Sequence, residues 1–328
     1  MNPLQQLLES EPYILLDGAM GTMLMAMGLE QGDPPEEWNV ICPDRVLGVH
    51  EGYIAAGSRL ILTNTFGGTR YRLKLHNLHN RVHELNYAAA QLARRAADNA
   101  PHLIVVAGSM GPTGELLEPM GTMTFDQARD AFAEQAAGLS EGGVDLLWVE
   151  TMSDLEELRA AVEGARSVCD LPVAASMTFD TNRHTMMGVS PQQAVQALRG
   201  LNLIAMGANC GNGPAEIEDV IGAMVDEDPG VPLIAKSNAG IPRLVGGSEL
   251  IYDGTPVVMA GYAHRVHNMG ARLIGGCCGN TPDHMRAMSA VLKGDTDPED
   301  LPSAPRPERQ VAAPSNNRRG HTRRHRRR

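Results

Sequence analysis

The feature that most constrains the fold is an eightfold alternation of a short apolar run with a longer segment of helical period. Runs that are apolar on both faces are typical of strands in a parallel sheet, because both faces of such a sheet are covered. Strict alternation of these strands with helices predicts an α/β fold. The predicted strands are Tyr13–Leu16, Arg59–Thr63, Leu103–Ala107, Asp145–Val149, Val173–Met177, Leu203–Gly207, Pro232–Lys236 and Arg272–Ile274.

The segments between these strands predict amphipathic helices. In Val82–Ala97, for example, Val82, Leu85 and Ala89 fall on one helical face. Eight βα units predict a (β/α)8 TIM barrel over residues 1–298. A doubly wound open sheet is the competing fold, and the lack of a GxGxxG turn after the first strand disfavours it. The other predicted helices are Pro43–Ala56, Phe125–Leu139, Leu155–Val168, Pro191–Leu198, Ala215–Val225, Pro256–Met269 and Pro282–Leu292.

Charge is distributed unevenly along the chain. The net charge is −11, yet the last 13 residues carry seven arginines and no acidic residue. The remaining residues hold 21 basic and 39 acidic side chains, a balance that disfavours nucleic acid as a partner of the barrel. Residues 299–328 are rich in proline and arginine and have no apolar period, which predicts a disordered basic tail. Contact of this tail with polyanions is the alternative to a solvated end.

The composition predicts a cytoplasmic protein. Five cysteines, an odd number in a chain of 328 residues, argue against a disulfide scaffold and for a reducing compartment. No apolar run has the length of a membrane span, and the polar start at Met1–Glu11 is unlike a secretory signal. The sequence leaves the oligomeric state open, a homo-oligomer included.

Polar and small residues follow each predicted strand. Asp17-Gly18 comes after the first strand and Glu150-Thr151 after the fourth. Barrel enzymes carry their chemistry at the carboxyl ends of the strands, where side chains from several strands converge. The sequence therefore predicts an active site at this face of the barrel.

Three cysteines lie in glycine-flanked turns at this same face, Cys210 after the sixth strand and Cys277-Cys278 after the eighth. Three thiolates can hold a zinc ion and leave its fourth position open, as in a catalytic zinc site. A substrate thiol in the open position would be deprotonated at neutral pH. The alternatives are buried cysteines that pack as small apolar side chains, and a strained disulfide between Cys277 and Cys278.

Taken together, these motifs resemble the homocysteine S-methyltransferase family, and most of all its bacterial betaine–homocysteine members. The resemblance covers roughly residues 10–293, and the paired GANCG and GGCCG motifs are its most specific part. The matching stretches are Asp17–Thr22, Thr63–Phe66, Gly111–Thr113, Glu150-Thr151, Met186–Val189, Gly207–Gly211, Lys236–Pro242 and Gly275–Gly279.

This resemblance implies a zinc enzyme that methylates homocysteine to methionine. Its Zn2+ cofactor would be held by Cys210, Cys277 and Cys278, and the homocysteine sulfur would supply the fourth ligand. The thiolate would attack a methyl group on a cationic nitrogen or sulfur. Since the leaving group departs neutral, the reaction needs no general acid, and no catalytic side chain is assigned.

The same resemblance implies how the amino-acid part of homocysteine is bound. Asp17 and Glu150 match the positions that hold the ammonium group, and backbone amides around Gly18, Ala19 and Met20 would take the carboxylate. Elementary chemistry agrees, because an ammonium group favours carboxylates and glycine-rich turns present N–H groups to anions. The structural alternatives are a turn residue or helix cap at Asp17 and a salt bridge at Glu150.

Glycine betaine is the predicted methyl donor, and dimethylglycine the product. Aromatic ring faces commonly hold a quaternary ammonium group. Gly67 and Thr151 stand where the animal betaine enzymes carry tyrosines, so the donor pocket cannot be copied from them. The predicted donor-pocket residues are Trp38, Phe66, Tyr71 and Phe179, with Tyr252 and Tyr262 as further aromatic candidates, while Trp148 is expected to pack inside the barrel.

Other functions stay open at this point. The donor could be S-methylmethionine, another onium compound or a separate corrinoid protein. Lys236 at a strand end could form a Schiff base in a barrel aldolase. A non-catalytic zinc- or RNA-binding barrel that uses the arginine tail is a further alternative, and it predicts that removal of the tail abolishes the main activity.

Overall fold

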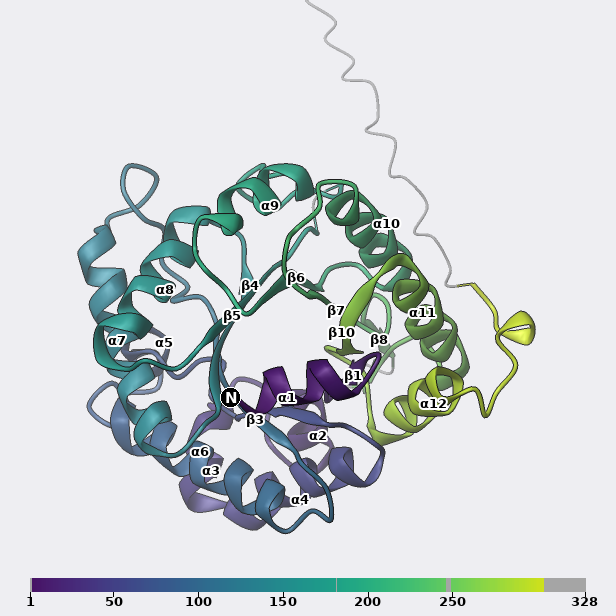
Figure 1. The fold of residues 1–328 in the computed structure, drawn as a ribbon. Coiled ribbons are helices and arrows are strands. Elements are labelled where there is room, and N and C mark those ends of the chain that lie inside the picture. Colours follow the sequence, from purple (N-terminus) through teal and green to yellow (C-terminus); the bar gives the residue numbers. More distant parts are fainter. Residues whose placement is uncertain (1, 181, 246–248, 304–328) are drawn as a thin grey trace, which may run out of the picture.

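The computed structural model describes residues 2–303 except 181 and 246–248. Eight parallel strands alternate with helices and form a closed barrel, so the predicted TIM barrel is confirmed. In Figure 1 the helices form a ring around the strands. The strands are β1 (Ile14–Leu15), β2 (Leu60–Leu62), β3 (Val105–Met110), β4 (Leu146–Met152), β5 (Val173–Met177), β6 (Ala205–Cys210), β7 (Leu233–Ser237) and β10 (Ala271–Gly276).

Closure of the barrel follows from the strand order β1-β10-β7-β6-β5-β4-β3-β2. The two ends of this order meet where Leu16, next to β1, pairs in parallel with Leu60 of β2. The outer helices after these strands are α4 (Pro43–Ala55), α6 (Val82–Asp98), α7 (Phe125–Glu141), α8 (Leu155–Val168), α9 (Pro191–Arg199), α10 (Pro214–Val225), α11 (Pro256–Met269) and α12 (Pro282–Lys293).

Local signals explain where these helices begin and end. Thr124 and Ser190 cap the first turns of α7 and α9, each in a reciprocal capping box with the glutamine three residues on. Gly270 and Gly294 end α11 and α12 in the left-handed conformation that glycine adopts without strain. The predicted helix bounds therefore agree with the observed ones to within one or two residues.

Four strands extend two or three residues further toward their carboxyl ends than the sequence predicted. Strand β6 runs to Cys210, where a turn was expected, and β4 runs through Glu150 to Met152. The reason is that polar residues at the carboxyl end of a barrel strand still take part in the parallel ladder, as Cys210 pairs with Ser237. Strands β3 and β10 are longer than predicted in the same way.

Several short elements were not predicted. The helix α1 (Pro3–Ser10) covers one opening of the barrel and is seen across the front of the ring in Figure 1. The remaining short elements lie in the loops or after α12. They are α2 (Met20–Ala26), η1 (Pro35–Glu37), α3 (Trp38–Ile41), α5 (Arg70–Lys74), the antiparallel hairpin of β8 (Arg243–Val245) and β9 (Glu249–Ile251), and η2 (Pro298–Asp300).

The core has two layers. Alternate strand residues point into the barrel, where they pack with Leu4 and Leu7 of α1. Trp148 is fully buried in this inner layer, as predicted. The outward-facing strand residues pack against the helices in a second and larger layer.

The last described residues continue past the predicted end of the barrel at residue 298. Leu301 and Pro302 lie against Gly261 of α11, so the chain still contacts the barrel beyond η2. Residues 304–328, which make up most of the predicted basic tail, lie outside the described residues. None of the helices in the described part of the chain combines the length and the apolar character that a bilayer crossing requires.

Candidate metal centre and substrate site

The three predicted metal ligands come together at the carboxyl end of the barrel. Their sulfur atoms lie within 4.8 Å of one another, and the Sγ atoms of Cys210 and Cys277 are 3.0 Å apart. In a tetrahedral zinc site with Zn–S bonds of about 2.3 Å, neighbouring sulfurs are about 3.8 Å apart. Small shifts of the thiols therefore give this geometry. All five cysteines of the chain are free, so Cys277 and Cys278 form no disulfide.

Strand order explains why cysteines that are far apart in sequence meet. Strand β7 lies between β6 and β10, and its last residue is Ser237. Cys210 pairs with Ser237 on one side, and the Cys277 amide donates to the Ser237 carbonyl on the other at 2.7 Å. The Ser237 backbone thus bridges two ligands that come from strands two apart in the sheet.

Cys210 is held in an unusual backbone conformation by its neighbour Asn209. Cys210 has φ 63°, in the left-handed region that non-glycine residues rarely adopt. The Asn209 amide group is fully buried and donates to Thr151 Oγ1 at 2.6 Å and to Cys210 Sγ at 3.5 Å. Its oxygen accepts from the Thr151 amide and from the Ser176 hydroxyl. The hydrogen bonds of Asn209 with Thr151 and Ser176 therefore fix the amide group that contacts the Cys210 sulfur.

The Cys277-Cys278 turn is fixed by two other asparagines. Asn238 accepts a hydrogen bond from the Cys278 amide at 2.9 Å, and Asn280 donates to the carbonyls of Ser237 and Cys277. The Asn280 carbonyl in turn accepts from the Ala19 amide and the Tyr53 hydroxyl. This links the cysteine turn to the turn after β1.

Gly18 is required at that second turn. A Cβ atom at Gly18 would lie 2.7 Å from the Asn280 carbonyl oxygen and 2.8 Å from the Tyr53 ring. Such distances are shorter than van der Waals contact, so a larger residue would push the two turns apart. The predicted glycine-rich turn is therefore packed directly beside the cysteine turn.

The three thiols shift one another's pKa values. Hydrogen bonds from Cys210 and Cys277 lower the pKa of the Cys278 thiol. Contacts with Cys277, and then with Cys278, raise the pKa of the Cys210 thiol. A metal ion competes with the thiol protons, because thiols bind metals as thiolates.

Directly above the apolar floor of the barrel lies a polar layer. Trp148 and Ile234 belong to the floor, and Glu150 and Lys236 follow two residues later on the same strand faces. Lys236 Nζ donates to Asp17 Oδ1 at 3.1 Å, and both side chains are 4% exposed. Asp17 Oδ2 also accepts from the Leu62 amide at 2.7 Å. One of the two predicted ammonium-binding carboxylates, Asp17, therefore forms an ion pair with a buried lysine.

Burial and charge set the ionisation of this layer. Burial raises the pKa of Glu150 to about 7, while the Lys236 charge opposes this shift. The Ser109 hydroxyl donates to Glu150 Oε1 at 2.5 Å. Burial lowers the pKa of Lys236, but the charges of Asp17 and Glu150 outweigh it and raise that pKa above its usual value. A lysine held protonated in this way is a poor nucleophile, which disfavours the Schiff-base alternative.

The predicted donor-pocket aromatics differ in how far they are buried. Trp38 and Phe179 are buried in the outer core layer, and the Arg45 guanidinium covers the Trp38 ring at 4.9 Å. Tyr71 packs against the same layer, whereas Phe66 is 39% exposed beyond β2. Tyr262 is fully buried. The part of these residues in donor binding stays a prediction.

Tyr252 packs beside the cysteine turn. Its ring lies on Gly279, where an added Cβ would lie 2.4 Å from the ring. The charge of Cys278 is one cause of the raised pKa of Tyr252, after burial.

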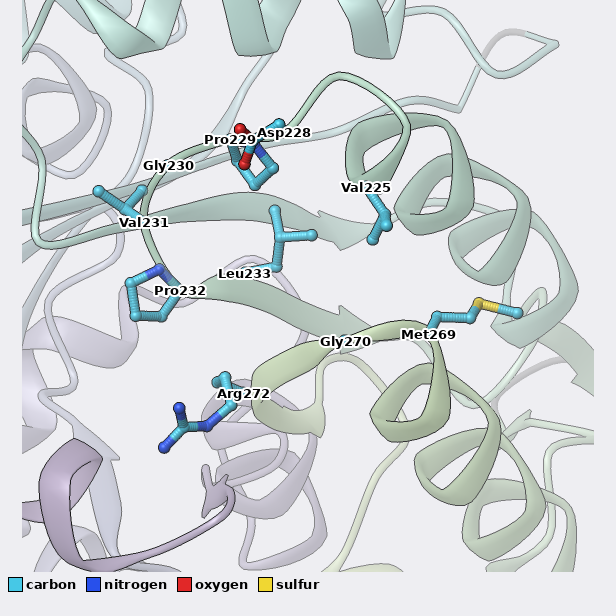
Figure 2. Close-up of a pocket in the computed structure, with 10 residues that line it drawn as sticks. All are labelled: Val225, Asp228, Pro229, Gly230, Val231, Pro232, Leu233, Met269, Gly270 and Arg272. Atoms are coloured by element: carbon cyan, nitrogen blue, oxygen red, sulfur yellow. The ribbon is translucent and has the colours of Figure 1, made fainter.

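A hollow with a different character lies at the opposite end of the barrel. Figure 2 shows that it is lined by the loop before β7 and by the start of β10, with Arg272 on one side. The Arg272 guanidinium donates to the carbonyls of Leu8 and Glu11, both at 2.7 Å, and so holds the end of α1. These contacts assign Arg272 to closing the barrel rather than to the cysteine face.

Residues 14–292 match the family described as homocysteine S-methyltransferase. The chain belongs to the homocysteine S-methyltransferase family. It is 33% identical to the methionine synthase of Mycobacterium tuberculosis over 320 residues, which cover 92% of this chain and 26% of that protein. The methionine synthase of Mycobacterium leprae is 34% identical over 312 residues, 90% of this chain and 25% of that protein. The chain thus spans about a quarter of the length of these curated relatives.

A solved structure agrees with this family assignment. The metallated form of the homocysteine methyltransferase MmuM from Escherichia coli has a TM-score of 0.75 and 26% identity, covering 88% of this chain and all of that one. The predicted family is therefore confirmed. These relatives carry the names methionine synthase and homocysteine methyltransferase, so they do not establish the narrower betaine-dependent type, which stays a prediction.

Some residues of the site could not be predicted from their own sequence context. Ser109, Ser176 and Asn209 contact the site through the register between neighbouring strands, which the sequence of one strand does not specify. A weak signal does exist for Asn209, which immediately precedes a predicted ligand. Lys236 was noted as a strand-end lysine, but not as the partner of Asp17.

Proposed function

We propose that this chain transfers a methyl group to the sulfur of homocysteine and releases methionine at a zinc site formed by Cys210, Cys277 and Cys278. The observation that carries the proposal is the meeting of three thiols with a buried carboxylate pair at the active face of the barrel. Thiols suit the metal and the substrate's sulfur, and carboxylates suit its ammonium group. Family membership supports the same substrate.

The three thiols fit zinc better than other common metals. Soft thiolate ligands select zinc or copper(I), and three of them leave a fourth tetrahedral position for a further ligand. When bound, a zinc ion supplies a Lewis acid that lowers the pKa of a thiol at that position. The role of the chain is to hold the three sulfurs and their supporting asparagines in one geometry.

The amino-acid part of homocysteine is assigned to the layer beside the cysteines. Asp17 and Glu150 take the ammonium group through charge-assisted hydrogen bonds. The Ala19 amide already donates to the Asn280 carbonyl at 3.0 Å, so it is engaged within the protein. We therefore assign the substrate carboxylate to the amides of Gly18 and Met20 on either side of Ala19.

The transfer itself balances without a proton donor. The homocysteine sulfur forms a bond to the methyl carbon, and the bond from that carbon to the cationic donor atom breaks. The electron pair of the broken bond stays with the donor, which leaves as a neutral amine or thioether. The remaining contribution of the chain is alignment of the two substrates and exclusion of water.

Glycine betaine is the first donor to test. Phe66, Tyr71 and Tyr252 are the candidate rings that remain partly exposed, and each could lie over a quaternary ammonium group. Within the described part of the chain, no ring contact joins these three residues into a closed aromatic cage. S-methylmethionine and a methylated corrinoid protein are therefore the other arms of the donor screen.

The test combines metal analysis with this donor screen. Purified protein should contain about one zinc per chain and form methionine from homocysteine with one of the three donors. In Cys210→Ser the zinc should be lost and turnover should fall about 10³-fold, since metal catalysis contributes several kcal/mol. Cys169→Ser, at the distant end of α8, is the matched control and should keep both properties. Normal zinc and turnover in Cys210→Ser would overturn the site.

A further inference from the structure

Lys236 is a buried cation that the proposed chemistry does not yet use. Among the side chains that the structure describes, Lys236 is the one lysine or arginine that is buried. Strand β7 places it between Asn209 of β6 and Gly275 of β10, two residues above the floor residue Ile234. A Cβ at Gly275 would lie 2.6 Å from Leu16 Cβ and 2.9 Å from the Asp17 carbonyl oxygen, so the absence of a side chain there lets the residue pair Leu16-Asp17 approach β10 closely.

The charges around this lysine do not balance. Asp17 accepts its hydrogen bond at 3.1 Å, and Glu150 is buried in the same layer. Two carboxylates and one ammonium group leave one negative charge in a site that is nearly closed to water. Burying an uncompensated charge is costly, so the layer favours a ligand that brings one more cation.

A pair of carboxylates also needs a cation to stay ionised. Like charges in one buried site disfavour each other, so one of the two would otherwise hold a proton. A protonated carboxyl offers an ammonium group much less attraction than a carboxylate. The charge of Lys236 offsets this repulsion and opposes the rise that burial causes in the pKa of both carboxyl groups.

We propose that Lys236 is a positioning residue that holds Asp17 in place and keeps the Asp17 and Glu150 carboxylates ready for the ammonium group of an amino-acid substrate. The inference rests on the proposed homocysteine site and deepens it. Lys236 itself contacts neither the substrate nor the metal in this scheme. It makes the site selective for a thiol that carries an amino group over one that does not.

The direct test compares two ligands of the zinc-loaded protein by calorimetry. L-homocysteine and 4-mercaptobutanoate share the thiol and the carboxylate and differ in the amino group. The native chain should bind homocysteine more tightly. Lys236→Met should reduce this preference about tenfold, as expected if one of the two carboxylates loses its charge. Lys293→Met, at the exposed end of α12, should leave the preference unchanged.

A double-mutant cycle separates positioning from direct contact. If Lys236 acts through Asp17, the variant with both Asp17→Asn and Lys236→Met should bind homocysteine no more weakly than Asp17→Asn alone. The double variant can still be measured if Lys236→Met alone fails to fold, because it leaves no Asp17 carboxylate buried without its partner. Additive losses would overturn the proposal, and so would equal losses for the two ligands.

The outcomes distinguish this inference from the function on which it rests. Homocysteine binding by the native chain, with an unchanged ligand preference in Lys236→Met, would overturn the role of Lys236 alone. Failure of the zinc-loaded native chain to bind either thiol would overturn the proposed homocysteine site, and the role of Lys236 with it.

Discussion

Asn209 uses its whole amide group to fix the metal ligand that follows it. It donates to Cys210 Sγ and bonds on its other side to Thr151 and Ser176. An N–H donor to a thiolate spreads the sulfur's charge, and the two hydroxyl residues set the direction of that donor. Groups of this kind around a metal site typically tune its affinity.

We expect Asn209→Ala to weaken zinc binding by about 10- to 100-fold while the fold remains intact. Competition with a chromophoric chelator measures the affinity, and circular dichroism checks the fold. Asn268→Ala is the control, because Asn268 lies on the exposed side of α11 and its side chain hydrogen-bonds to His264, away from the cysteines. Equal zinc affinities in the two variants would remove Asn209 from the metal site.

At the residue scale, the sequence predicted reactive groups better than their partners. Cys210, Cys277 and Cys278 were found because cysteines in glycine-flanked strand-end turns are informative by themselves. The role of the aromatic residues stays a prediction, because a ring such as Trp38 or Phe179 packs in a core as readily as it binds a cation. The sequence does not show which face of its element a ring will occupy.

Helix α1 shows how an element outside the βα repeat completes the barrel. Leu4 and Leu7 are buried with the inward-facing strand residues, and Asn2 caps the helix while donating to the Asp145 carbonyl. Arg272 binds the carbonyls at its other end. The helix therefore closes the opening opposite the cysteine face.

Leu7→Ala should lower the free energy of unfolding by about 2 to 5 kcal/mol, as for other large-to-small changes in a core. Its cost comes from lost apolar burial and from the cavity left at the base of the barrel. Urea unfolding measures the change. Met120→Ala, at a position that is 70% exposed, should change stability by less than about 0.5 kcal/mol. A similar small effect for Leu7→Ala would mean that α1 does not seal the barrel.

Sequence periodicity predicted the long elements and missed the short ones. Helices α8 and α11 and strand β5 have the predicted bounds, because caps, prolines and apolar period agree there. Helices α2, α3 and α5 have four to seven residues, too few for a helical period to be recognised. Their formation depends on packing against the barrel, which the local sequence does not encode.

At the scale of the whole molecule, the reactive groups and the strong positive charge lie in different parts of the sequence. The cysteines, Asp17, Glu150 and Lys236 all belong to the described barrel. The seven terminal arginines lie in residues 304–328, outside the described part of the chain. A methyltransferase site in the barrel should therefore work without them, whereas a barrel that uses the tail to bind RNA should not.

We expect a chain that ends at Ser303 to keep its zinc and to form methionine at a rate within about twofold of the full chain, since surface changes away from a site are worth about 0.5 kcal/mol or less. Ending the chain there preserves the contact of Leu301 and Pro302 with Gly261 of α11. A full-length variant with the seven arginines changed to glutamine removes the charge and keeps the length. The acidic barrel disfavours polyanions by itself, so a polyanion would have to bind through the tail. Loss of methionine formation in both chains would show that the tail has a part in catalysis. Loss in the shortened chain alone would assign that part to tail length rather than to charge.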